Sequence, residues 1–180
     1  MQNLSKLSKI FLYLCSLSGI LWLGGYLSRL LLTYELFQPK DFLLKPYVSQ
    51  ANMPGIFTTL NASVTFTFVL FIVFLLTFIL FLVTSGISLK QQGWLFVIML
   101  IIAVTAPFEI YLMTIDYNII TKVFYNASFD AGEILSLYIK RLKILSSFSL
   151  IEIFSYCAIV FLVLFRPLTM KKDQKAVEGI

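Results

Sequence analysis

The sequence predicts an all-α membrane protein, an antiparallel bundle of four transmembrane helices. First, 59% of the 180 residues are hydrophobic and only 13% are charged, whereas soluble domains carry about a quarter charged residues and under half apolar ones. Second, the chain contains 18 phenylalanines, which would leave a soluble protein of this size with large exposed apolar patches. Third, four separate segments each reach the roughly 20 mostly apolar residues that a spanning helix needs.

The four predicted spans carry at most one charged residue each. Arg29 lies in the first, Glu109 in the third and Glu152 in the fourth, and the second has no charge. Each span is expected to be a helix, because hydrocarbon offers no partner to an unpaired backbone group. The predicted boundaries are about 10–32, 64–89, 94–115 and 144–165.

The connections between the spans differ in length. The second and third spans are joined by a short turn, which predicts that these helices are antiparallel neighbours. The first connection, 33–60, contains Pro39, Pro46 and Pro54, so it cannot be one regular helix. Within it, segment 40–47 alternates charged and bulky residues, a pattern that suits the headgroup layer.

The third connection has a helical pattern of its own. Asp130 is followed three residues later by Glu133, which is the spacing of a capping box at a helix N-terminus. From Ala131 the pattern continues without interruption into the fourth span. We therefore expect one long helix that projects well beyond the bilayer.

The chain is expected to form one domain over residues 1–170, followed by a disordered basic tail, 171–180. The apolar stretch of the first span is too long for a secretory signal, so we expect an uncleaved span. Four spans place both termini on one face. Of the 14 Lys and Arg residues, seven lie on the side of the termini and seven on the other, so the positive-inside rule gives no orientation. The compact basic clusters at the termini favour a cytoplasmic location for both ends, in a bacterial inner membrane.

Charged and polar residues from different spans converge at one level of the predicted bundle. Arg29 lies near the end of the first span, Glu109 near the end of the third and Glu152 near the start of the fourth. At about 1.5 Å per residue, all three reach a similar depth on the side of the long connections. Small and polar residues share their helical faces, as expected where membrane helices pack together. The predicted intramembrane polar cluster consists of Arg29, Asn61, Glu109, Asp116 and Glu152.

Two interpretations of this cluster stay open. In the first, Arg29 hydrogen-bonds Glu109 or Glu152 and fixes helix packing, which offsets the roughly 2.5–3.5 kcal/mol that a charge costs at the bilayer centre. In the second, the cluster is a polar site for an ion, a proton or a small solute. Pro107, two residues before Glu109, removes a backbone hydrogen bond and is a candidate kink beside the cluster.

No set of residues in the chain predicts an enzymatic reaction. The absence of histidine excludes histidine-ligated haem and every histidine-based catalytic pair, and no phosphate-binding glycine loop occurs. Cys15, Met99 and Cys157 fall in the leaflet nearest the termini, where a soft metal could bind. They lack the CxxC spacing, and lone Cys and Met residues in apolar helices ordinarily serve packing. We therefore expect no metal, no cofactor and no enzymatic activity.

Two segments carry a family resemblance. The first, "GILWLGGYLSRLLLTYELF" (19–37), has a Leu-Trp-x-Gly-Gly opening and a Phe beyond the span. The second, "RLKILSSFSLIEIF" (141–154), has a Ser and then Leu-x-Glu at the spacing of a known fourth helix. Together they resemble a small family of four-helix bacterial membrane proteins of unknown function, similar in pattern to the copper-resistance D proteins.

The resemblance implies a four-helix architecture. Ser146 or Ser147, together with Glu152, agrees with the family pattern. Lys143 stands where the family has a histidine, and Ser149 stands where it has an asparagine. Without the histidine, the resemblance does not extend to a metal-handling role.

The function expected from the sequence is that of a non-enzymatic accessory or scaffolding subunit of an inner-membrane assembly. The alternative is a small ion, proton or solute transporter or channel that uses Arg29, Glu109 and Glu152. The expected partners are the lipid bilayer and other membrane proteins or a second copy of the chain. The net charge of +5 bears on membrane topology and anionic lipid rather than on nucleic acid.

Overall fold

The computed structural model describes residues 4–39, 42–87, 89, 92–125, 129–144 and 147–169. Its helices are α1 (Lys6–Glu35), α2 (Met53–Ser85), α3 (Gly93–Tyr125), α4 (Ala131–Lys143) and α5 (Phe148–Phe165). Four of them, α1, α2, α3 and α5, are long and apolar enough to cross a membrane. The predicted all-α bundle of spanning helices is confirmed, and the protein is a multi-pass membrane protein. The predicted tail, 171–180, lies outside the described residues.

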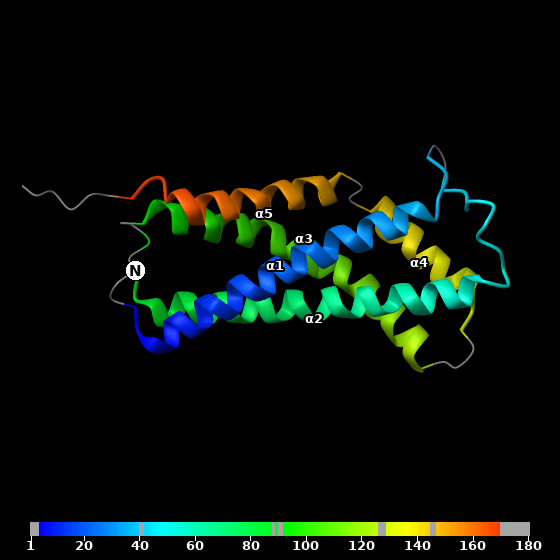
Figure 1. The fold of residues 1–180 in the computed structure, drawn as a ribbon, viewed down its shortest axis with the longest axis horizontal. Helices are drawn as coiled ribbons and strands as arrows, with labels where there is room; N and C mark the ends of the chain where they lie inside the picture. Colours follow the sequence, from blue (N-terminus) through cyan, green and yellow to red (C-terminus); the bar gives the residue numbers. More distant parts are fainter. Residues whose placement is uncertain are drawn as a thin grey trace, which may run out of the picture.

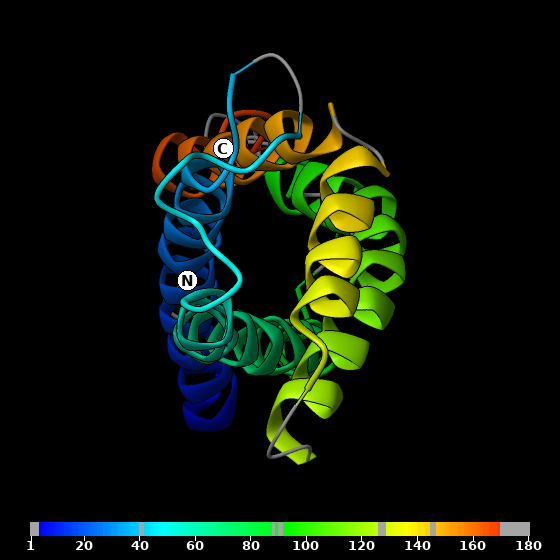
Figure 2. The same cartoon turned by 90° about the vertical axis from the view of Figure 1, so that its right-hand side faces the viewer.

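The bundle has two halves along its long axis. The helices α1, α2 and α3 run through both halves, whereas α5 lies in the half nearest the termini and α4 in the half nearest the long connections (Figure 1). Viewed from the long-connection end, α4 lies over α3 (Figure 2). Each half has its own apolar core. We call them the inner core, around Trp22, Phe71 and Trp94, and the outer core, around Phe57, Ile119 and Ile134.

The first connection is shorter than predicted, because α2 begins at Met53 and not near residue 64. Pro54 lies in the first turn of α2, where the missing N–H of proline has no helical partner to lose. The connection itself folds back as a small hairpin, in which the N–H of Lys45 donates to the carbonyl of Leu36 at 2.9 Å. The predicted headgroup segment, 40–47, includes two residues outside the described part of the chain.

Close packing of α1 on α2 depends on glycine. A Cβ atom on Gly25 would lie 3.0 Å from the methyl group of Thr67, and one on Gly19 would lie 3.1 Å from the ring of Phe74. Small residues of this kind let membrane helices approach closely. The approach at Gly25 brings the next turn of α1, which carries Arg29, against Thr67 of α2.

The predicted unbroken helix from Ala131 into the fourth span is wrong. The helix α4 ends at Lys143, Ile144 is extended with ψ of 121°, and α5 begins at Phe148. The break lets α4 turn its buried face, which includes Ile134 and Tyr138, onto the outer core. A straight continuation of α5 would carry that apolar face away from the bundle, so burial of the face favours the break.

The N-terminus of α4 is capped as predicted, although only half of the capping box forms. The side chain of Asp130 accepts a hydrogen bond from the N–H of Gly132 at 2.8 Å. Glu133 instead pairs with Lys122 of α3 at 2.6 Å. This exposed ion pair helps to hold α4 against α3.

Helix lengths indicate how the bundle sits in a bilayer. The 33 residues of α2 and of α3 extend about 50 Å, well beyond a hydrocarbon layer of about 30 Å. The 18 residues of α5 extend only about 27 Å, so α5 has to lie almost wholly within that layer to span it. At its start, the rings of Phe148 and Phe108 lie 5.0 Å apart. We therefore infer that this pair marks the boundary of the hydrocarbon on the long-connection side, with α4 outside it.

Candidate functional site: a charge cluster between two apolar cores

Five ionisable side chains from four helices meet between the inner and the outer core. We call them the charge cluster: Arg29 of α1, Glu109 and Asp116 of α3, Arg141 of α4, and Glu152 of α5. Every member is buried, with exposed fractions between 0% for Glu152 and 7% for Arg141. Such burial is unusual for charged residues unless they are paired. The pairing within the cluster therefore decides what it can do.

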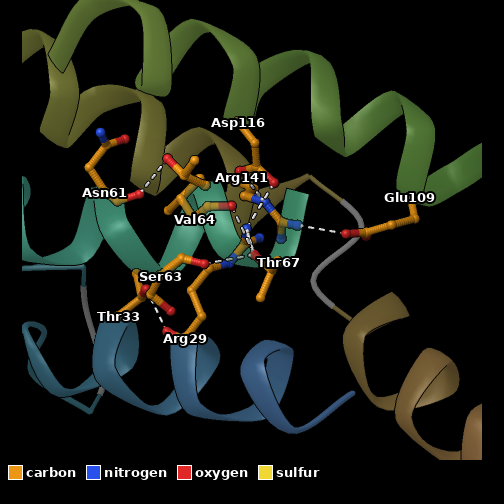
Figure 3. Close-up of polar contacts among 10 residues, drawn as sticks. Arg29, Thr33, Asn61, Ser63, Val64, Thr67, Glu109, Asp116 and Arg141 are labelled. Atoms are coloured by element: carbon orange, nitrogen blue, oxygen red, sulfur yellow. Dashed lines mark hydrogen bonds and ion pairs between the residues drawn. The ribbon is translucent and has the colours of Figure 1, made fainter. Parts of the chain in front are cut away.

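Asp116 is the most completely paired member. Its Oδ2 accepts a hydrogen bond from Nη1 of Arg29 at 3.0 Å, and its Oδ1 accepts one from Nε of Arg141 at 2.7 Å. Nη1 of Arg29 also donates to the hydroxyl of Thr67 at 3.1 Å. Figure 3 shows the two guanidinium groups converging on this carboxylate. Asp116 thus links α1 and α4 through α3.

Arg141 continues the network toward the membrane. Its Nη2 donates to Oε1 of Glu109 at 3.1 Å, as Figure 3 shows. Burial disfavours the charged guanidinium, but the nearby carboxylates of Asp116 and Glu109 outweigh this effect and raise the pKa of Arg141 above its ordinary value. Arg141 is therefore a permanent cation that holds two acids of α3, one on either side.

The predicted hydrogen bond between Arg29 and Glu109 or Glu152 is wrong. Arg29 binds Asp116, which lies seven residues, or about 10 Å, beyond Glu109 along α3. The cation at Glu109 is instead Arg141, which is not among the predicted cluster residues. The helical spacing could have revealed Arg141, because it lies on the same face of α4 as Ile134, Tyr138 and Leu142. This face is buried.

Glu152 lies on the membrane side of the cluster and has no hydrogen-bond partner among the described residues. It is four residues into α5 from Phe148, about 6 Å inside the boundary. Its side chain is completely buried, and neither carboxyl oxygen has a hydrogen-bond partner among the described residues. The neighbouring polar groups are the carboxyl of Glu109 and the hydroxyl of Tyr26. Oε2 of Glu109 and the Tyr26 hydroxyl are likewise without a partner in the described part of the chain. Unpaired polar atoms therefore collect around the Glu109–Glu152 pair.

The charges of the cluster do not balance. Two guanidinium groups stand against three carboxyl groups, so the fully ionised cluster carries one negative charge. An unpaired charge in a low-dielectric environment is strongly unfavourable. Addition of one proton or one monovalent cation neutralises the cluster.

An aromatic layer closes the cluster toward the termini. The ring of Trp22 is fully buried and lies 4.6–5.2 Å from the rings of Tyr26, Phe71 and Tyr156. Beyond this layer, the buried hydroxyls of Ser18 and Thr77 donate to carbonyls of their own helices. Among the described residues, no charged side chain is buried in that part of the bundle. Among the described residues, the charged network therefore approaches this layer from the long-connection side.

Asn61 lies apart from the charged members of the predicted cluster. It is buried in α2, six residues before Thr67, and its Oδ1 has no partner among the described residues. Pro107 lies within α3, and the helix continues through it. Cys15 is buried, whereas Cys157 is exposed on α5. In the described ranges, no group of three or more Cys, Asp or Glu side chains is placed to hold a metal ion.

Comparisons with models of protein families, with curated proteins and with solved structures found no match. The resemblance to the small four-helix bacterial family stays a prediction.

Proposed function

We propose that this membrane protein acts without catalysing a reaction, by binding and releasing one proton at the Glu109–Glu152 carboxyl pair. The observation that carries the proposal is the Glu152 side chain, which is fully buried with both carboxyl oxygens unpartnered in the described part of the chain. Ionisable residues inside membrane helices commonly belong to proton or ion pathways. One proton shared by the two acids removes the excess negative charge of the cluster.

A proton fits this site better than a cation does. Hard cations such as Ca²⁺ take six or more oxygen ligands, whereas the described part of the chain leaves three carboxyl oxygens of this pair unpartnered, two on Glu152 and one on Glu109. The guanidinium of Arg141 also binds the same carboxyl pair through Glu109, and it would repel a second cation. A proton needs no coordination shell and can bridge two carboxyl groups.

The arrangement favours a proton-responsive accessory subunit over a channel. The aromatic layer around Trp22 separates the pair from the face of the termini. On the other side, the cluster extends to Arg141, its most exposed member, which lies two residues before the end of α4. Protonation would therefore report the pH on the long-connection side. With the termini cytoplasmic in a bacterial inner membrane, as the basic clusters favour, this is the outer side.

A purely structural role is the second candidate, and the pairing of Asp116 favours it. Both of its oxygens are bound by guanidinium groups from α1 and α4, so this half of the cluster ties helices together. The two roles differ in whether they involve Glu152. Among the described residues, Glu152 makes no hydrogen bond to the network around Asp116.

Infrared spectroscopy of the purified protein over a range of pH tests the proposal. A protonated buried carboxyl has its own C=O stretching band, and we expect one that disappears in Glu152→Gln and shifts in Glu109→Gln. The exposed Glu35 provides a control, because Glu35→Gln should leave the band unchanged. If the folded Glu152→Gln variant keeps the full spectrum of the parent, the proton proposal fails and the structural role stands.

A further inference from the structure

A groove opens between α3 and α5. Its volume is about 750 Å³. It extends on α3 from Leu100 to Phe108 and on α5 from Ser147 to Ser155. Both stretches lie at or inside the boundary that Phe108 and Phe148 mark, so the groove faces the acyl chains of the bilayer.

The lining of the groove is mainly apolar, with a positive charge at one end and the hydroxyl groups of Thr105 and Ser155 further in. Lys143 and Ser147 line the mouth, at the break between α4 and α5. Leu100, Val104 and Ile151 line the walls further in. Lys143 is exposed, and its ammonium group lies 5.4 Å from the centre of the Phe42 ring. A cationic mouth above an apolar trough is complementary to one phospholipid, with its phosphate at the mouth and an acyl chain in the trough.

We propose that this groove is a binding site for an anionic phospholipid, with the headgroup phosphate at Lys143 and one acyl chain between α3 and α5. The length of the groove favours lipid over a helix of another protein. Eight residues separate Ser147 from Ser155, about 12 Å along α5, whereas a spanning helix would make contact over most of a 30 Å hydrocarbon layer. An anionic headgroup is preferred because each Lys near the surface attracts anionic lipid by about 1 kcal/mol.

The lipid site stands independently of the proposed proton site. None of the charge-cluster members lines the groove. Thr105, which is buried and lines the groove, is next to Tyr156 of the aromatic layer. Variants at the mouth and walls of the groove therefore test lipid binding without altering the acids.

Native mass spectrometry tests the proposal. The protein is incubated with equal amounts of phosphatidylglycerol and phosphatidylcholine and is then released from detergent for the measurement. We expect one retained lipid, predominantly phosphatidylglycerol. Lys143→Gln should reduce the retained phosphatidylglycerol about fivefold, the factor that one lysine provides. Lys140→Gln is the matched control, because Lys140 is exposed on the same helix but does not line the groove.

Substitutions that fill the trough distinguish lipid binding in the groove from nonspecific association of lipid with the protein surface. Ile151→Trp should abolish retention of both lipids, whereas Leu150→Trp, at an exposed neighbour outside the groove, should not. Ser155→Leu is a smaller filling change for use if Ile151→Trp does not fold. Equal retention by Lys143→Gln and Lys140→Gln would overturn the proposal. So would full retention by the filled variants, or a change of oligomeric state in place of lipid loss.

Discussion

At Asp116, guanidinium groups from two different helices share one carboxylate. Removing either partner of a buried ion pair leaves an uncompensated charge, which typically destabilises a protein by about 3–5 kcal/mol. Exposed pairs contribute roughly 1 kcal/mol or less. This difference in stabilisation between buried and exposed pairs arises from the environment of the charges and not from the number of ion pairs.

We predict that Arg141→Ala lowers the free energy of unfolding by about 3 kcal/mol or more. The change leaves Glu109 without its cation and Asp116 with only Arg29. Lys122→Ala, which removes the exposed pair with Glu133, should lower it by at most about 1 kcal/mol. Chemical denaturation in detergent measures both. Equal effects of the two substitutions would contradict a structural role for the buried network.

Residues of the charge cluster could be found from the sequence to different degrees. Arg29, Glu109 and Glu152 stand out because each is a single charge in an apolar run. Arg141 does not, since it lies between Lys140 and Lys143 in a segment that looks like a solvated surface. The choice of partner could not be predicted at all. It depends on how far α4 folds back over α3, which helical periodicity along a single chain does not specify.

At the scale of elements, α4 shows where sequence patterns are insufficient. The continuity of the helical pattern from Ala131 predicts one long helix, since no Pro or Gly interrupts residues 133–165. The break at Ile144 comes from tertiary burial, because Ile134 and Tyr138 become almost fully buried only when α4 packs on the outer core. The spanning helices were predictable because their apolar lengths leave few alternatives in a bilayer.

We predict that α4 lies outside the hydrocarbon on the same side as the first connection. In a background with Cys15→Ser and Cys157→Ser, an impermeant thiol reagent should label Ser136→Cys and Gln50→Cys from one face of sealed vesicles. It should label Lys6→Cys from the other face. All three positions are exposed. Labelling of position 136 from the same face as position 6 would contradict the arrangement, and protection of position 136 from both faces would place α4 within the bilayer.

At the scale of the whole molecule, two apolar cores enclose one layer of charge. The inner core lies beside α5, and the outer core lies beneath α4. The charge cluster between them has one more acid than base, and the surplus is at the membrane side, at Glu152. In this arrangement, the same residues determine both the stability of the bundle and its protonation state.

The direction from which the proton reaches Glu152 tests this account most directly. The protein is reconstituted in vesicles of uniform orientation, and the pH is changed on one face while the other face stays buffered. The readout is the carboxyl C=O band assigned with Glu152→Gln. We predict that the band responds to pH on the long-connection face and not on the face of the termini, because the aromatic layer around Trp22 blocks the second route. A band that follows the pH of the termini face would contradict the account.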